Sequence, residues 1–95
     1  MKPNLAPPAR ATRVGEWEDF GVGFRAFDGP EWRIKHATGD AGRVDIVVSV
    51  IGVQYADGRA LREIIIDCPD TPVMTLPQAR KLARALMAAA DSAGG

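Results

Sequence analysis

Residues 31–36 alternate between a largely apolar set and a charged set, which is the period-two pattern of a strand with one buried face and one face in water. Residues 17–27 alternate in the same way but less cleanly, because Gly21 and Gly23 interrupt the pattern. The sequence therefore predicts one clear strand, preceded by a segment whose strand character it leaves open.

Two chain reversals are predicted on either side of this strand. Asp28-Gly29-Pro30 is a turn signal before it, and residues 38–42 contain two glycines that reverse the chain after it. Together these signals favour an antiparallel arrangement with short connections.

The range 43–68 carries the longest apolar pattern and predicts a β-hairpin. Asp57-Gly58 near its middle favours a two-residue type I′ turn, because both central positions of that turn need a positive φ. In the register that this turn sets, Val50 faces Ile65, and both faces of the hairpin are apolar near its base. One face carries Val44, Ile46, Val48 and Val50, and the other carries Val47, Ile51, Ile64 and Ile66.

Residues 75–91 predict an amphipathic helix. Thr75 and Gln78 fit a capping box at its start, and Pro77 falls in the first turn, where its missing N–H has little cost. The apolar stripe, centred on Leu82 and Leu86, comprises Leu76, Ala79, Leu82, Ala83, Leu86, Met87 and Ala90, with Ala85 and Ala88 away from its centre.

These elements predict an α+β fold, in which a three- or four-stranded antiparallel β-meander is followed by one C-terminal helix packed on one face. Ninety-five residues suffice for one domain only. We assign residues 16–95 to that domain. Residues 1–15 hold three prolines and scattered charges, and they predict a flexible N-terminal arm.

Composition narrows the class of protein. Twelve basic residues balance twelve acidic ones, so no global field attracts the chain to nucleic acid or to anionic lipid. Cys68 is the only cysteine, which excludes an internal disulfide, and the N-terminus lacks the apolar core of a signal peptide. No apolar run reaches the ~18 residues of a membrane span. A cytoplasmic location is expected.

The last 40 or so residues resemble small actinobacterial proteins, some of them phage-borne, in which a hairpin around an Asp-Gly turn precedes a helix of the type L-T-P-x-Q-A-R-x-L-A-x-x-L-x-x-A-A-D. The resemblance implies this fold and a bacterial source, and it implies no activity. The Cys/His cluster that some of these relatives carry near the N-terminus has no counterpart here. The matching residues are Thr75, Pro77, Gln78, Ala79, Arg80, Leu82, Ala83, Leu86, Ala89, Ala90 and Asp91.

Residues suited to catalysis or metal binding are few. Cys68, His36, Asp67 and Asp70 are the only plausible zinc ligands, and no spacing motif links them. Residues 21–23 are half of a dinucleotide fingerprint without the strand, turn and helix that it needs. We therefore expect no metal, no cofactor and no enzymatic activity.

Two hypotheses of function follow. The first is a non-enzymatic protein-interaction module that acts as a small homodimer, because one helix covers only one face of an apolar sheet and a second copy would cover the remainder. The second is a nucleic-acid-associated regulator that uses the basic side of the helix. The candidate interaction surface comprises Arg59, Arg62, Arg80, Lys81 and Arg84.

Overall fold

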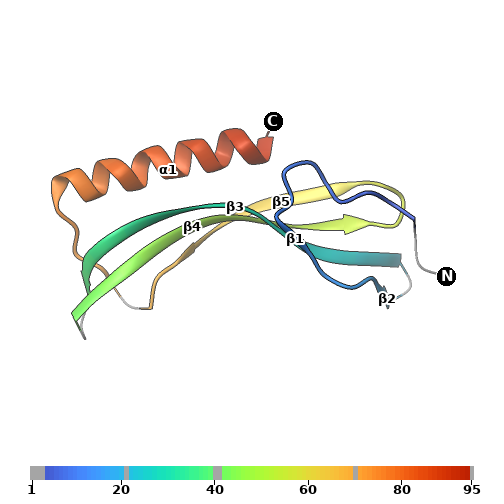
Figure 1. Cartoon of the computed structure of the whole chain (residues 1–95), viewed down its shortest axis with the longest axis horizontal. Coiled ribbons are helices and arrows are strands. Elements are labelled where there is room, and N and C mark those ends of the chain that lie inside the picture. The colour runs from blue at the N-terminus through green and yellow to red at the C-terminus, as the bar shows by residue number, and fades with distance from the viewer. Residues whose placement is uncertain (1–3, 21, 40–41, 70, 95) are drawn as a thin grey trace.

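The computed structural model describes residues 4–20, 22–39, 42–69 and 71–94. These residues form one open antiparallel sheet with a C-terminal helix, so the predicted α+β class is confirmed. The sheet order is β1-β3-β4-β5, and β2 also pairs with β3. The elements are β1 (Arg13–Val14), β2 (Glu18–Phe20), β3 (Val22–Gly39), β4 (Gly42–Tyr55), β5 (Ala60–Asp67) and α1 (Leu76–Gly94) (Figure 1).

The prediction of a turn at Asp28-Gly29-Pro30 is wrong, because β3 runs through these residues without reversing. Asp28 pairs with Ile51 and Glu31 pairs with Ser49, so two residues of β3 lie opposite a single residue of β4. This arrangement is a β-bulge, which accommodates a proline inside a strand and bends it. The signal that indicated a turn therefore marks a bend within one long strand.

A second bulge follows at residues 35 and 36 of β3, where the register shifts again. His36 has a positive φ of 65°. The carboxylate of Asp45 accepts the backbone N–H of His36 at 3.2 Å and also pairs with the guanidinium of Arg33 at 3.3 Å. Beyond this bulge Gly39 pairs with Gly42, so the predicted reversal is confirmed, although its two central residues lie outside the described ranges.

The hairpin turn between β4 and β5 lies where it was predicted, but its register differs by one residue. Gly58 has a φ of 95°, whereas the N–H of Tyr55 donates to the carbonyl of Arg59 at 2.8 Å and closes a three-residue loop. Val50 therefore faces Ile64 instead of Ile65. Because successive side chains point to opposite faces, this shift moves Ile64 and Ile66 to the face of Val48 and Val50.

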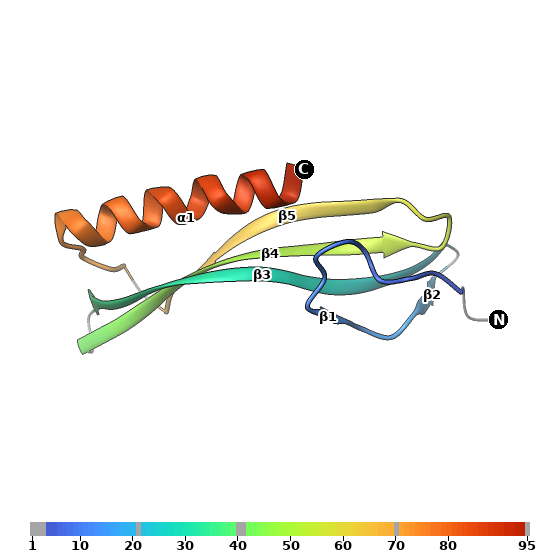
Figure 2. The same ribbon diagram turned by 45° about the horizontal axis from the view of Figure 1, so that its top comes forward.

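Helix α1 lies along one face of the sheet, which we call the helix face (Figures 1 and 2). The core beneath it contains Ile34 of β3 together with Ile46, Val48 and Val50 of β4, all at most 2% exposed. The side chains of β4 that alternate with these lie on the opposite face, which we call the open face.

The buried centre of the helix stripe differs from the prediction. Ala85 and Ala89 are the buried helix residues, whereas Leu82 and Leu86 are only partly buried and pack beside them. Ala85 was predicted to lie away from the centre, and that is wrong. Small side chains at the contact allow the helix backbone to approach the sheet closely, and the leucines then fill the flanks.

The start of α1 is tied to the sheet by its cap. The N–H of Thr75 donates to the Gln78 side chain at 2.8 Å, and the N–H of Gln78 donates to the Thr75 hydroxyl at 3.2 Å, so the predicted capping box is confirmed. The Gln78 amide also donates to the carbonyls of Lys35 and His36, each at 3.1 Å. The helix therefore begins at a fixed point beside the second bulge.

The close approach at Ala89 leads to a prediction. Ala89 is 0% exposed, so Ala89→Leu inserts a side chain where no space exists and should lower the free energy of unfolding by about 1–3 kcal/mol. Ala90 is the next residue and is exposed, so Ala90→Leu should stay within about 0.5 kcal/mol. Urea denaturation of both variants measures this difference. Equal midpoints would contradict the observed helix face.

The helix covers only part of the helix face, and the N-terminal segment covers another part. Residues 5–10 lie on the same side of the sheet as α1, next to its C-terminal end (Figures 1 and 2). The guanidinium of Arg10 donates to the carbonyl of Ser92 at 3.1 Å, and Arg62 of β5 donates to the carbonyl of Ala9 at 3.1 Å. The flexibility of residues 1–15 stays a prediction.

Candidate interaction surface

Strand β5 lies at the edge of the sheet and, among the described residues, pairs only with β4. Four large apolar side chains of this short strand are exposed: Leu61 (52%), Ile64 (38%), Ile65 (44%) and Ile66 (50%). Ile64 and Ile66 lie on the helix face, and Leu61 and Ile65 lie on the open face. Soluble proteins usually protect an edge strand with charges, prolines or a covering element, so this edge is unusually open to another strand.

The backbone of β5 also presents hydrogen-bonding groups to this edge. Tyr55 and Arg59 form a hydrogen-bonded pair at the hairpin loop. In an antiparallel ladder such pairs alternate with non-bonded pairs, so the N–H and C=O groups of Ala60, Arg62, Ile64 and Ile66 point away from β4. The edge therefore offers both apolar side chains and a row of backbone donors and acceptors.

The five basic residues predicted as an interaction surface do not form one surface. Arg59 lies at the hairpin tip, where its guanidinium pairs with Asp57 at 2.7 Å and lies 5.0 Å from the centre of the Tyr55 ring. The backbone N–H and the guanidinium of Arg59 hold the pKa of Asp57 below its ordinary value of 3.8. Arg62 is half-buried beneath the N-terminal segment. These two cations are therefore engaged within the chain.

The remaining three basic residues lie on α1, where all are exposed. Lys81 and Arg84 line a shallow depression of about 400 Å³ between the helix and β3, together with Trp32 and Arg33. Arg80 does not line it. The structure thus brings Lys81 and Arg84 beside the Trp32 ring. The Arg33 side chain lies on the open face, where its guanidinium pairs with Asp45 at 3.3 Å and with Glu31 at 3.6 Å.

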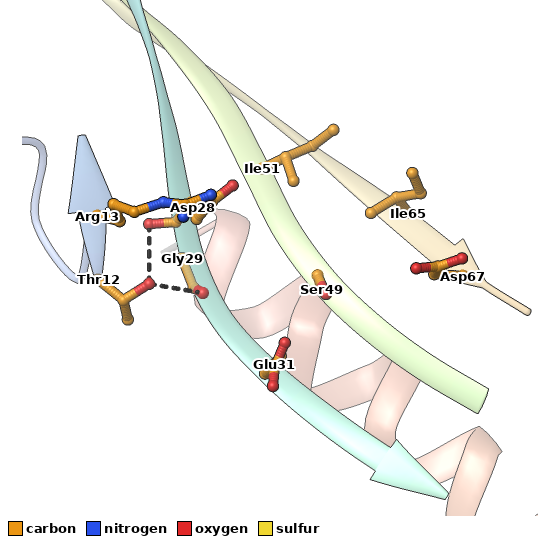
Figure 3. A pocket seen from close by; sticks show the side chains of 9 residues that line it. All are labelled: Thr12, Arg13, Asp28, Gly29, Glu31, Ser49, Ile51, Ile65 and Asp67. Atoms are coloured by element: carbon orange, nitrogen blue, oxygen red, sulfur yellow. Dashed lines mark hydrogen bonds and ion pairs between the residues drawn. The ribbon is translucent and has the colours of Figure 1, made fainter. Parts of the chain in front are cut away.

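The open face carries a second, larger depression of about 590 Å³ (Figure 3). Its walls come from β1, β3, β4 and β5, with Glu31 and Asp67 beside Ser49 and Ile65. At its margin Arg13 pairs with Asp28 through an Nε–Oδ2 distance of 3.0 Å.

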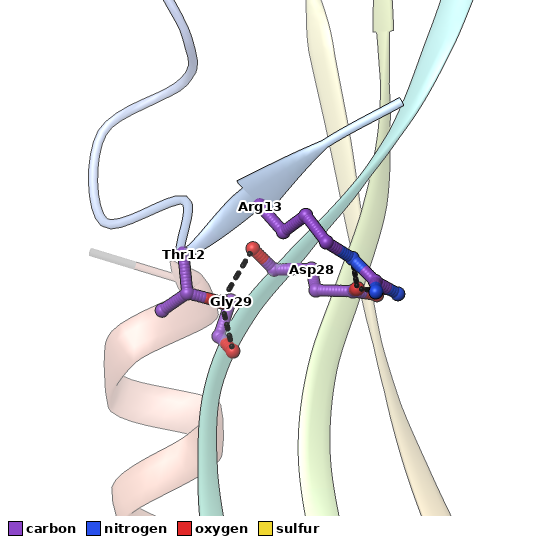
Figure 4. Close-up of polar contacts among 4 residues, drawn as sticks. All are labelled: Thr12, Arg13, Asp28 and Gly29. Carbon is purple, nitrogen blue, oxygen red and sulfur yellow. Dashed lines mark hydrogen bonds and ion pairs between the residues drawn. The ribbon is translucent and has the colours of Figure 1, made fainter. Parts of the chain in front are cut away.

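The Thr12 hydroxyl donates to the backbone carbonyls of Asp28 and Gly29, at 3.3 and 3.2 Å (Figure 4). These contacts join the N-terminal segment to the first bulge of β3. They place Thr12 and the ion pair of Arg13 at one side of the open-face depression.

Of the four residues considered for metal binding, Asp67 lines the open-face depression and Asp70 lies outside the described ranges, whereas Cys68 and His36 lie in two other settings. Cys68 is partly buried and packs against the core beneath α1, whereas His36 is exposed at the second bulge. In the described ranges, no group of three or more His, Cys, Asp and Glu side chains is placed to hold a metal ion. No helix of the described residues combines the length and the apolar character needed to span a bilayer.

No family model, curated protein or solved structure matches this chain. The resemblance of the hairpin and helix to small actinobacterial proteins therefore stays an expectation. The free edge of β5 is the most distinctive surface of the described structure.

Proposed function

We propose that this protein is a non-enzymatic protein-interaction module that acts as a homodimer in a bacterial cytoplasm, and that β5 is its contact. The observation that carries the proposal is the open, apolar edge of β5, with Ile64, Ile65 and Ile66 each at least 38% exposed. A second strand added to this edge would satisfy the outward backbone groups and bury these side chains together.

The shape of the chain supports a partner of its own size. The radius of gyration is 16.0 Å, against about 12 Å for a compact domain of this length. The accessible surface is 6515 Å², whereas a monomer of 10.2 kDa ordinarily exposes about 5,300 Å². The excess of about 1,200 Å² is larger than the roughly 800 Å² that each partner buries in a standard interface, so the chain exposes enough extra surface for one.

A two-fold axis perpendicular to the sheet leaves the helix faces of both copies on the same side. Even-numbered residues of β5 therefore face even-numbered residues of the second copy, and odd-numbered residues face odd-numbered ones. Centring the axis on Glu63 would place two Glu63 carboxylates directly opposite each other. Centring it on Ile65 would place Glu63 opposite Asp67 of the second copy. Centring it on Ile64 avoids both repulsions, places Ile64 opposite itself and joins the outward backbone groups of the two strands.

The predicted dimer has a measurable mass. Sedimentation equilibrium at micromolar concentration should give about twice the chain mass of 10.2 kDa. Ile66→Lys introduces a charge at the contact and should give monomers, because like charges and buried unpaired charge oppose edge pairing. Val73→Lys is the matched control, since Val73 is 68% exposed and lies outside β5. A wild-type protein that is monomeric at this concentration would contradict the proposed dimer.

The register between the two β5 strands can be tested by cross-linking. Single cysteines are introduced into β5 of a chain in which Cys68 is replaced by serine. Only the residue on the axis meets its own copy at about 5.5 Å between Cα atoms, which a disulfide can bridge. Ile64→Cys should therefore cross-link fastest under mild oxidation, ahead of Glu63→Cys and Ile65→Cys. Faster cross-linking at either neighbour would show a dimer with another register.

A nucleic-acid-associated regulator is the second candidate. The depression lined by Lys81, Arg84 and Trp32 favours it, because cations beside an aromatic ring suit phosphates and stacked bases. We rank it second because the net charge of the chain is zero. A salt series separates the two candidates, since phosphate contacts weaken steeply with salt whereas apolar association does not.

A further inference from the structure

Two polar side chains are buried in the half of the sheet that α1 does not cover. Arg25 of β3 is 8% exposed, and Gln54 of β4, directly opposite it, is 5% exposed. The Nε of Arg25 donates to the Gln54 side-chain oxygen at 2.8 Å. Burying a guanidinium and an amide is costly unless their remaining donors are also satisfied.

The N-terminal segment accepts a hydrogen bond from each of these two side chains. Arg25 donates to the carbonyl of Leu5 at 3.1 Å, and the Gln54 amide donates to the carbonyl of Ala6 at 2.9 Å. Farther along, Arg62 donates to the carbonyl of Ala9 at 3.1 Å. Three side chains from three strands thus donate hydrogen bonds to main-chain oxygens of one short segment.

Aromatic rings lie against two of these side chains. The guanidinium of Arg25 lies 4.6 Å from the centre of the Trp17 ring, and that of Arg62 lies 5.5 Å from the centre of the Phe27 ring. Phe27 is only 3% exposed. We call Arg25, Gln54, Arg62, Trp17 and Phe27 the arm groove.

The segment in the groove has a defined chemistry. Pro7 and Pro8 have no N–H and hold the chain extended, and the residue before each of them is also restricted to extended conformations. The carbonyls of Ala6 and Ala9 that accept hydrogen bonds are three residues apart. Polyproline II repeats every three residues, so this spacing directs both oxygens to the same side. Donors beside aromatic rings are the usual means of recognising such segments.

We propose that the arm groove is a binding site for an extended, proline-containing segment of another protein, and that residues 5–9 occupy it in cis until such a segment displaces them. The recognised groups are main-chain oxygens, which any extended segment with prolines at these positions supplies. The arm buries Arg25 and Gln54, so an occupant must supply acceptors to the donors that it covers, and main-chain oxygens do so here.

The cis occupant carries a strain that a separate segment would not. Its joint to β1 passes through Arg10, a non-glycine residue with a positive φ of 65°. Such a conformation is strained for a residue with a side chain. Exchange of the arm for a free segment releases this strain, which favours displacement.

The test uses the full chain, in which Pro7 and Pro8 are both replaced by glycine to weaken the cis occupant without altering the groove. The probe is a synthetic peptide with the sequence of residues 4–10, and the matched control is the same peptide with glycine at both proline positions. The reporters are the side-chain amide resonance of Gln54 and the indole resonance of Trp17.

We expect the Gln54 amide resonance to shift in the glycine chain and to return to its wild-type position when the proline peptide is added. The proline peptide should bind the glycine chain at least tenfold more tightly than it binds wild type, where the cis arm competes, and at least fivefold more tightly than the control peptide binds. Gln54→Met, checked for folding by circular dichroism, and Arg62→Met should each abolish the preference for the proline peptide.

Three results would overturn the proposal. The first is an unchanged Gln54 resonance in the glycine chain, which would mean that the prolines do not hold the arm. The second is a shifted resonance that the proline peptide does not restore. The third is equal restoration by the control peptide.

Discussion

Ile34→Ala is expected to lower the free energy of unfolding by about 2–5 kcal/mol. Ile34 is 2% exposed and faces Ile46 across β3 and β4, directly beneath α1. Removing its outer carbons leaves a cavity that β3 and β4 cannot close, because their ladder hydrogen bonds fix both strands. A domain of this size has a total stability of about 5–15 kcal/mol, so the variant should lose a large part of it.

The matched control is Met87→Ala, since Met87 is 69% exposed on α1 and alanine is a good helix former. Its stability should stay within about 0.5 kcal/mol of wild type. Urea denaturation followed by circular dichroism measures both variants at one protein concentration. A loss at Ile34 no greater than that at Met87 would mean that the core does not lie between the helix and the β3–β4 hairpin.

Gly52→Ala should destabilise by about 1–3 kcal/mol or more, although the change adds only one methyl group. Gly52 lies opposite Phe27 on the helix face. A Cβ at Gly52 would collide with the Phe27 ring and with the backbone carbonyl of Leu61. The carbonyl belongs to the paired strand β5 and cannot move without breaking the hydrogen bonds between β4 and β5. The collision therefore cannot be relieved by a small shift of a side chain.

Gly15→Ala is the control for this change. Its new Cβ would lie 3.4 Å from the carbonyl of Ala26, an ordinary contact. Alanine also restricts the unfolded chain, so the variant should be neutral or more stable by up to about 1 kcal/mol. Thermal denaturation of the two variants should therefore give shifts of different size, and a neutral Gly52→Ala would show that Phe27 does not rest on this glycine.

The fold was largely predictable because its strongest signals are local. The capping box of Thr75 and Gln78 and the alternation in residues 31–36 depend on neighbours within a few residues. The hairpin loop shows the limit of such signals, because Asp57-Gly58 suits a three-residue loop with glycine in the left-handed conformation as well as a two-residue turn. Only the packing of the isoleucines on either face decides between the two registers.

Gly29-Pro30 failed as a turn signal for a related reason. A bulge and a turn both accept a residue without an N–H, and the choice depends on whether the partner strand continues past it. Here β4 is 14 residues long and pairs with β3 on both sides of the bulge. The length of β4 was visible in the sequence, but its pairing with β3 on both sides of the bulge was not.

The candidate sites were less predictable, since they join residues far apart in the chain. The basic residues of the helix and of β5 looked like one set, but Arg62 lies under the N-terminal segment while Lys81 and Arg84 lie beside β3. The arm groove had no local signal at all. Neither Arg25 nor Gln54 is distinguished by its sequence neighbours, and their burial depends on an arm that lies 20 and 48 positions away.

The hydrogen bond between Arg10 and Ser92 spans 82 positions of the chain. During synthesis the arm leaves the ribosome well before its anchor on the last turn of α1. The groove donors at positions 25, 54 and 62 emerge between them, so the hairpin can assemble and receive the arm before the helix exists. Contacts of such long separation form slowly, so we expect the arm to close against the helix after the hairpin has assembled.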